Sequence, residues 1–169
     1  MYLEVKTIFM FKLSLRKIKN SDKKYFTKWW RDKDLLKMTS GILKPISDKE
    51  VDEYFAAIYK NPSSLEFMID LGAKAIGHIS LVKRKNNWHE TQMVIGDKKF
   101  WDKGYGTKAI LLLMQKAKRL KIQKIFLEVR PTNARAIKAY ENSGFIRKKI
   151  KKYPKNKNLP ETLRMERVL

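Results

Sequence analysis

"FWDKGYGTKA", residues 100–109, places Gly104 and Gly106 directly before a strongly amphipathic segment. The first turn of a helix carries unpaired N–H groups and the positive end of the helix dipole. Glycines at that point let an anion approach the backbone closely. Positive side chains lie nearby, at Lys98, Lys99 and Lys103. The stretch therefore predicts a phosphate or diphosphate site where a loop enters a helix.

The two glycines alone do not separate a phosphate site from a tight strand-to-helix turn. The sequence lacks the GxxxxGK[ST] pattern of a P-loop, and "GYGTKA" lacks the third glycine of a dinucleotide fingerprint. Further motifs are needed to decide between these alternatives.

The composition limits the classes of protein that fit. With 169 residues, 43% of them hydrophobic, we expect one domain with a sizeable core. The chain has no cysteine, which excludes disulfides, thiolate metal sites and cysteine nucleophiles, and two histidines argue against a metal centre. We expect no membrane span, no secretory signal and a cytoplasmic location. Met1 and Met10 are alternative expectations for the native start; with a start at Met10, residues 1–9 would be a non-native or extra N-terminal extension.

The net charge of +22 is concentrated in one part of the chain. Residues 98–158 carry 19 Lys and Arg against three acidic residues. Such a field attracts phosphates, nucleotides or RNA, so an anionic partner is one interpretation. Lys outnumbers Arg 30 to 9, and we therefore interpret most of these lysines as a solvated surface of biased composition.

Hydrophobic periodicity predicts alternating strands and helices in one continuous unit. Apolar–polar alternation indicates strands, and a spacing of three to four residues indicates helices. A tight turn is expected at Gly72-Ala73, and a basic hairpin loop at 147–158. The mixed order favours an α+β fold, or a mixed α/β sandwich, around one sheet. The strands are predicted at 12–18, 65–71, 75–84, 90–96, 124–130 and 163–169, and the helices at 20–32, 47–61, 107–120 and 133–145.

A second motif, "NARAIKAYENSGF" at 133–145, follows the glycine loop by about 25 residues. Together they resemble the GNAT superfamily of acetyl-coenzyme A-dependent N-acetyltransferases. The branch that acetylates N-terminal amines of ribosomal proteins commonly has Trp-Gly-x-Gly-Tyr-Ala-Thr-Glu-Ala in this loop. The resemblance extends over about 12–169 and is specific over 90–145. Two positions depart from it, Asp102 in place of Gly and Lys108 in place of Glu. The matching positions are Trp101, Gly104, Tyr105, Thr107 and Ala109.

The resemblance implies a single N-acetyltransferase domain over 1–169. Its GNAT-like fold would have a central mixed, mainly antiparallel sheet, splayed between two parallel central strands and flanked by helices. Acetyl-coenzyme A would be the cosubstrate, with no metal. Its pantetheine arm would lie along backbone groups of Val94, Ile95 and Gly96, and Asn133 would bind the arm or cap a helix. The diphosphate would lie on the loop, at Trp101, Asp102, Lys103, Gly104, Tyr105, Gly106 and Thr107.

The resemblance also assigns the proton transfers. Tyr140 would protonate the leaving thiolate, because a phenol of pKa about 10 is matched to a thiol of pKa about 8.5; the alternative is core packing. Glu90 would act as base, directly or through water; the alternative is an ion pair with Lys or Arg. His78 lies in a strand that reaches the same cleft, and we interpret it as an interior, hydrogen-bonded histidine. Tyr25, Trp29 and Trp30 would form a substrate wall; the alternative is packing on a helix face.

Three acceptor hypotheses remain open at this stage. The first is the N-terminal amine of a protein such as a ribosomal protein. The second is a small amine: an aminosugar nucleotide, a polyamine or an aminoglycoside. The third belongs to another class, a non-catalytic RNA- or ribosome-binding protein. The sequence is compatible with a monomer or a homodimer.

Overall fold

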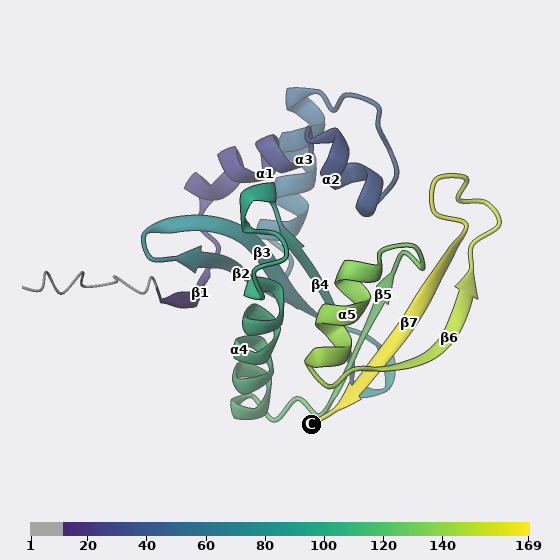
Figure 1. Cartoon of the computed structure of the whole chain (residues 1–169). Helices are drawn as coiled ribbons and strands as arrows, with labels where there is room; N and C mark the ends of the chain where they lie inside the picture. The colour runs from purple at the N-terminus through teal and green to yellow at the C-terminus, as the bar shows by residue number, and fades with distance from the viewer. Residues whose placement is uncertain (1–11) are drawn as a thin grey trace, which may run out of the picture.

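A computed structural model describes residues 12–169. The alternative starts at Met1 and Met10 lie outside the described residues. Within this range, seven strands form one sheet in the order β1-β2-β3-β4-β5-β7-β6, and helices flank it (Figure 1). The strands are β1 (Leu13–Lys17), β2 (Ser64–Leu71), β3 (Lys74–Lys83), β4 (Trp88–Ile95), β5 (Lys124–Val129), β6 (Ile146–Lys152) and β7 (Glu161–Val168). The α-helices are α1 (Lys23–Trp29), α2 (Lys33–Met38), α3 (Asp48–Tyr59), α4 (Tyr105–Arg119) and α5 (Ala134–Asn142).

β4 and β5 are parallel neighbours, whereas the other neighbouring strands pair antiparallel. Their pairing covers only three residues of each strand, from Trp88 to Glu90 and from Lys124 to Phe126. Beyond this point the two strands separate, with α5 beside the gap (Figure 1). The expected mixed, mainly antiparallel sheet that splays between two parallel central strands is confirmed.

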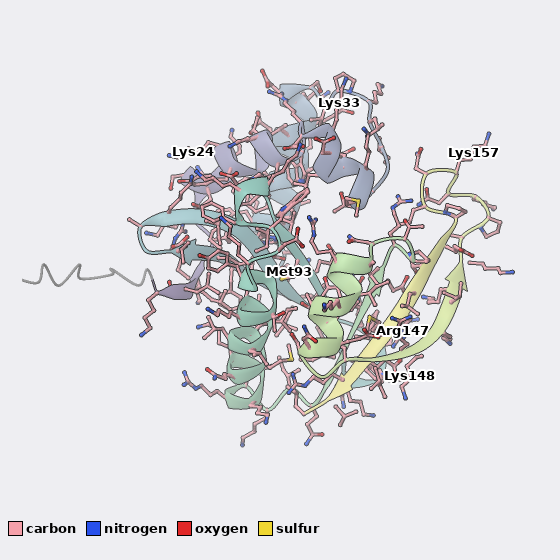
Figure 2. The ribbon with its side chains drawn as sticks, viewed as in Figure 1. Lys24, Lys33, Met93, Arg147, Lys148 and Lys157 are labelled. Carbon is pink, nitrogen blue, oxygen red and sulfur yellow. The ribbon has the colours of Figure 1, made fainter. Side chains whose placement is uncertain are left out.

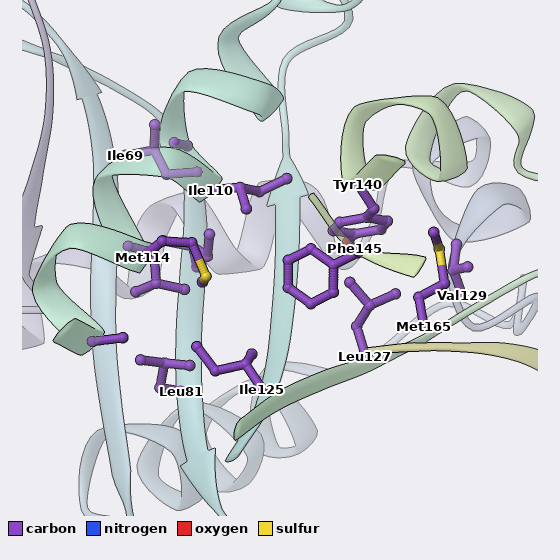
Figure 3. Close-up of a cluster of buried hydrophobic side chains, with 14 of the residues drawn as sticks. Ile69, Leu81, Ile110, Met114, Ile125, Leu127, Val129, Tyr140, Phe145 and Met165 are labelled. Atoms are coloured by element: carbon purple, nitrogen blue, oxygen red, sulfur yellow. The ribbon is translucent and has the colours of Figure 1, made fainter. Parts of the chain in front are cut away.

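Successive side chains of a strand point to opposite faces of the sheet, so the strands contribute to two separate cores. The larger core joins the sheet to α4 and α5, with Ile69, Ile110 and Leu127 among its buried members (Figure 3). The second joins the opposite face of β2 and β3 to α1, α2 and α3, through Phe26 and Met68. The α4–α5 face and the α1–α3 face of the sheet are therefore distinct surfaces, and the gap between β4 and β5 opens between them.

The N-terminal helical region differs from the prediction. One helix was expected at 20–32, with Asn20 or Ser21 as its cap. The structure instead has a 3₁₀ turn at Asn20–Asp22, then α1, and then α2 as a separate helix. Asp22 is buried and accepts hydrogen bonds from the Arg16 guanidinium at 2.8 Å and from the Lys19 amide at 2.7 Å. This contact between β1 and the turn depends on tertiary packing, which a propensity pattern does not contain.

Three local predictions also need correction. α4 begins at Tyr105, two residues earlier than expected, because Gly104 takes the left-handed conformation at φ 75° and starts the helix. Leu120, the last residue of the predicted helix 107–120, lies just beyond the end of α4 and is 54% exposed. The segment 147–158 is only partly a loop, because β6 runs to Lys152.

Basic residues of the C-terminal half lie on the outside of the molecule. Figure 2 shows Arg147 and Lys148 along β6, and Lys157 at the tip of the loop between β6 and β7. β6 is an edge strand, and its first five residues are exposed. This placement fits the interpretation of these charges as a solvated surface.

Candidate active site

The glycine loop is fastened across the end of β4. The Trp101 indole N–H donates to the Ile95 carbonyl at 2.7 Å. The Arg135 guanidinium lies 3.6 Å from the centroid of the Trp101 ring, as a cation–π contact between α5 and the loop. Asp97 begins the 3₁₀ turn Lys98–Phe100 by accepting from the Lys99 amide at 3.3 Å. These contacts hold the loop in one position relative to the strand.

The first turn of α4 presents free backbone amides. Gly104 is its N-cap, and no side chain caps the helix. Nothing lies within 4 Å of the position that a Gly104 Cβ would take, so the backbone is open to an approaching group. Gly106 is closer to its surroundings, because a Cβ there would lie 3.3 Å from the Met93 Cε. An anion placed at this turn would meet unpaired N–H groups and the positive end of a 15-residue helix.

A cavity of about 370 Å³ lies between this loop, β4 and α5 and extends to Leu35 and Met38 of α2. We call it the loop-side cavity. Its walls hold most of the residues predicted to bind the coenzyme: Val94, Ile95, Trp101, Asp102, Gly104, Tyr105, Gly106, Thr107 and Asn133. Lys103 and Gly96 are not part of its lining. Gly96 is buried beneath α1, where a Cβ would overlap the Trp29 indole.

The backbone of β4 decides which groups face the gap. The Gly96 amide donates to the Ile76 carbonyl of β3 at 2.9 Å, and Gly77 of β3 lies against the Val94 carbonyl. Because backbone groups of a strand point alternately to its two neighbours, Ile95 and Met93 direct their N–H and C=O toward β5. The gap therefore exposes Met93 and Ile95, and Met93 was not named from the sequence.

A second cavity, of about 490 Å³, lies on the α1–α3 face. We call it the helix-side cavity. Aromatic side chains of α1, Trp29 and Trp30, form part of its wall, and β3 and β5 contribute His78 and Glu128. Trp29 also packs in the second core at 3% exposure. The packing interpretation of this tryptophan is therefore confirmed, and its ring also lines the cavity.

Tyr140 lines both cavities from its place on α5. Its side chain is 6% exposed and packs edge-on against Phe145, with ring centroids 5.9 Å apart (Figure 3). Burial raises the pKa of Tyr140 to about 12. The phenol is therefore held in its neutral form, with a proton to donate, at the point where the two cavities meet.

Asn133 caps α5 and reaches a second helix. Its side chain accepts from the Ala136 amide at 3.2 Å and donates to the Met38 carbonyl at 3.2 Å. It is buried and lines both cavities. The helix-cap alternative is confirmed, and the residue also ties the end of α2 to α5 beside the gap.

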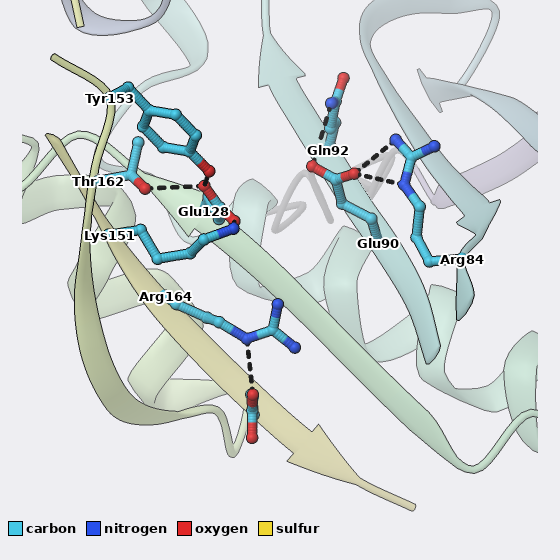
Figure 4. Close-up of polar contacts among 9 residues, drawn as sticks. Arg84, Glu90, Gln92, Glu128, Lys151, Tyr153, Thr162 and Arg164 are labelled. Atoms are coloured by element: carbon cyan, nitrogen blue, oxygen red, sulfur yellow. Dashed lines mark hydrogen bonds and ion pairs between the residues drawn. The ribbon is translucent and has the colours of Figure 1, made fainter. Parts of the chain in front are cut away.

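Glu90 lies at the last paired position of β4 before the gap. Its carboxylate accepts from the Arg84 guanidinium at 2.5 and 2.8 Å (Figure 4). The ion-pair alternative is thus present in the structure. Glu90 is not part of the lining of either cavity, so a part in the reaction would require a connecting water.

Glu128 is a carboxylate that the sequence analysis missed. On β5 it accepts hydrogen bonds from Lys151 at 2.8 Å, from Thr162 at 2.8 Å and from the Tyr153 hydroxyl (Figure 4). Burial acts to raise the pKa of Glu128, but the three donors outweigh it and hold the pKa below its ordinary value. A lone acid in the apolar strand "KIFLEVR" was the available signal. The carboxylate is a fixed negative charge in the helix-side cavity.

His78 is buried on the α1–α3 face, as expected for an interior, hydrogen-bonded histidine. Its Nε2 lies 2.7 Å from the Glu66 carboxylate of β2. The Phe26 ring meets the imidazole edge-on, at 4.9 Å between centroids. The residue nevertheless lines the helix-side cavity, so it is both packed and accessible from that side.

Residues 12–169 contain neither a metal-binding cluster nor a membrane-spanning helix. No three His, Asp or Glu side chains in this range cluster closely enough to hold a metal ion. No helix in the same range is long and apolar enough to cross a membrane.

Comparison with solved structures gives the same architecture over nearly the whole chain. A domain from Methanocaldococcus jannaschii superposes with a TM-score of 0.78 at 20% identity, covering 94% of this chain and 99% of that one. The spermidine N-acetyltransferase of Vibrio cholerae, solved with coenzyme A and spermine, gives 0.78 at 19% identity over 92% and 95%. An aminoglycoside acetyltransferase with coenzyme A and kanamycin gives 0.78 at 18% over 93% and 95%.

Sequence comparison identifies the family. No curated protein is a significant sequence match. The family model described as "Acetyltransferase (GNAT) domain" matches residues 12–146, which include β1 to β5, the glycine loop, α4 and α5. The chain therefore belongs to the GNAT family of acetyl-coenzyme A-dependent N-acetyltransferases.

Proposed function

We propose that this enzyme transfers acetyl directly from acetyl-coenzyme A to the N-terminal amine of a protein. The observation that carries the proposal is that two adjoining cavities share Met93 and Val94 of β4 and Tyr140 of α5 in their walls. The coenzyme enters from the loop side, and the amine enters from the helix side. Direct attack fits a chain without cysteine, since no thiol is present to carry an acetyl group.

On the loop side, the diphosphate lies on the amides of residues 104–107, and Trp101 holds the loop in place. The pantetheine arm adds to β4 as an extra strand in the gap, where backbone groups of Met93 and Ile95 face it. The Ile95 carbonyl already accepts from Trp101, so the free donors are the two N–H groups. One of them, close to Tyr140, polarises the thioester carbonyl and stabilises the oxyanion that forms on attack.

The Asp102 carboxylate lowers the affinity of this loop for the diphosphate, and replacing it should raise the affinity for coenzyme A. The residue is exposed and takes the left-handed conformation, with φ 57°, at the position where the loop pattern of the ribosomal-protein branch has glycine. For Asp102→Asn, which removes only the charge, we expect the Kd for coenzyme A to fall about two- to fivefold by calorimetry, the range for an exposed charge. Asp102→Gly should gain at least as much, because glycine also removes the conformational cost. Weaker binding by both variants would show that the carboxylate helps to hold the coenzyme.

On the helix side, the cavity suits a single ammonium group beside an apolar body. Glu128 supplies one ionised carboxylate, and much of the remaining wall is apolar or aromatic, including Trp29, Trp30 and Leu35. A protonated N-terminal amine has one positive charge and a pKa of about 8, so a fraction of the amine molecules is neutral at pH 7. The similarity of residues 101–109 to the ribosomal-protein branch supports the same acceptor.

A small amine is the second candidate. It is favoured by the structural likeness to enzymes solved with spermine and with kanamycin. Both of those ligands carry several positive charges. One carboxylate in the cavity and a net charge of +22 oppose their binding.

An acceptor panel tests the proposal. Thiol release from acetyl-coenzyme A is followed with an octapeptide that has a free N-terminus, with spermidine, with kanamycin and with a nucleotide-linked aminosugar. The octapeptide should give the highest kcat/KM, and its N-acetylated copy should give none. Turnover with spermidine or kanamycin alone would replace the protein acceptor by a small amine. Coenzyme binding without turnover of any acceptor would favour the non-catalytic alternative.

Glu128 should control the binding of the acceptor. For Glu128→Gln we expect kcat/KM for the octapeptide to fall about 10- to 100-fold, the equivalent of a hydrogen bond to a charged group of about 1.5–3 kcal/mol. The Kd for coenzyme A should not change. Glu141→Gln is the matched control, because Glu141 is exposed on α5 and pairs with Arg147 at 2.7 Å. Equal kinetics for the two variants would remove Glu128 from the acceptor site.

A further inference from the structure

His78 lies next to the backbone position where the thioester would be held. On β3 it is paired directly with Val94 of β4, so the two side chains are neighbours on the α1–α3 face. Val94 lines both cavities, and His78 lines the helix-side cavity. An amine that enters from the helix side therefore passes the imidazole as it approaches the gap.

Glu66 fixes the orientation of this imidazole. The side chains of His78 and Glu66 are 11% and 9% exposed, and Nε2 lies 2.7 Å from the carboxylate. A carboxylate on one ring nitrogen orients the ring and stabilises the imidazolium that forms when the other nitrogen takes a proton. Among residues 12–169, no hydrogen-bond partner occupies Nδ1. The pair has the arrangement of a proton acceptor with its orienting group.

The other candidate bases near the gap are engaged by cations. Glu128 accepts from Lys151, Tyr153 and Thr162, which hold its pKa low and make it a weak base. Glu90 is bound by Arg84 and is outside both cavities. The charged or titratable groups around His78 are thus Glu66 on β2, Glu128 and Arg130 on β5, and Tyr140 on α5, while α1 presents Phe26.

We propose that His78, oriented by Glu66, removes the proton from the acceptor amine; this inference rests on the proposed function. Glu128 holds the ammonium, which gives one proton to Nδ1 of His78. The nitrogen lone pair attacks the thioester carbonyl carbon, and the C–S bond breaks with its electron pair on sulfur. Tyr140 protonates the thiolate and recovers a proton from the nitrogen as the amide forms. The products are the N-acetyl amine and coenzyme A thiol, with one proton left on His78 for release to water.

The test is the pH profile of His78→Gln, measured with whichever acceptor of the panel is acetylated. The wild-type kcat/KM should rise with pH as the base loses its proton. The glutamine amide keeps a hydrogen bond to Glu66 but takes no proton. We expect kcat to fall about 100-fold or more, as on loss of a general base. The remaining rise should move up to the pKa of the acceptor's own amine, near about 8 for a peptide.

His89→Gln is the matched control, because it changes the chain's second histidine, which lies at the neighbouring β4 position to Glu90 and outside both cavities. It should keep the wild-type profile. Coenzyme A binding by calorimetry reports whether each variant is folded. Wild-type kcat and profile in a folded His78→Gln would overturn the inference.

If His78→Gln does not bind coenzyme A, the Glu66→Gln variant tests whether His78 acts as the base. This variant keeps the imidazole and removes the carboxylate that stabilises its protonated form. We expect kcat to fall about tenfold and the acid-side midpoint to move to lower pH. An unchanged profile would overturn the inference, whereas a wild-type enzyme that acetylates no amine would overturn the proposed function instead.

Discussion

Replacement of Tyr140 by Phe should lower kcat about 10²- to 10³-fold and leave the Kd for coenzyme A within twofold of the wild type. The loss is that expected when a general acid is removed from a thiolate leaving group. The ring stays in place, because Tyr140 is 6% exposed and packs against Phe145. Single-turnover thiol release, together with calorimetry for the coenzyme, separates the chemical step from binding.

The pH dependence of the wild type adds a second test of this assignment. Burial raises the pKa of Tyr140 to about 12, so the phenol stays protonated throughout the range in which the enzyme is assayed. Deprotonation of Tyr140 should therefore cause no decline in the wild-type kcat below about pH 11. Tyr54→Phe is the control, because Tyr54 is exposed on α3, and this variant should match the wild type. Wild-type turnover by Tyr140→Phe would show that water or another group protonates the thiolate.

Replacement of Gly77 by Ala should damage both stability and coenzyme binding. A Cβ at this position would overlap the Val94 carbonyl and would lie 3.2 Å from both the Ile69 Cδ1 and the Ile95 Cα. The obstacle is backbone, which cannot rotate away, so β3 and β4 must move apart. Overpacking of this kind costs about 1–3 kcal/mol, or roughly 2–12 °C in Tm for a chain of this size.

The same movement would displace the β4 groups that face the gap, so the Kd for coenzyme A should rise at least tenfold in the fraction that is folded. Calorimetric melting and coenzyme titration measure the two effects. Lys83→Ala is a control in the same strand, because Lys83 is exposed. A Gly77→Ala enzyme with unchanged melting and unchanged coenzyme affinity would show that β3 does not fix the position of β4.

Much of this fold follows from local sequence patterns. Alternation predicted the strands that became β1 to β5 and β7 to within a few residues, and the motifs at 100–109 and 133–145 predicted the loop, α4 and α5. At the start of α3, Ser47 and Glu50, three residues apart, form a capping box. These features depend on residues within one or two turns of each other, and that is why a single sequence contains them.

The parts that were missed depend on contacts between distant segments. Glu128 meets Lys151, Tyr153 and Thr162 only because β5, β6 and β7 are neighbours in the sheet. Likewise, the pairing of His78 with Val94 is a matter of strand register, which alternation does not fix. The orientation of the β4 backbone groups has the same origin. The separate start of α2 was missed for another reason, because it depends on a local cap, in which the Asp32 side chain accepts from the Asp34 and Leu35 amides.

A crystal structure of the complex with coenzyme A tests the central claim most directly. The account predicts the diphosphate on the amides of residues 104–107, the pantetheine arm between β4 and β5 beside Met93 and Ile95, and the sulfur within hydrogen-bond reach of the Tyr140 hydroxyl. Coenzyme A bound at another surface, or with its sulfur remote from Tyr140, would contradict it.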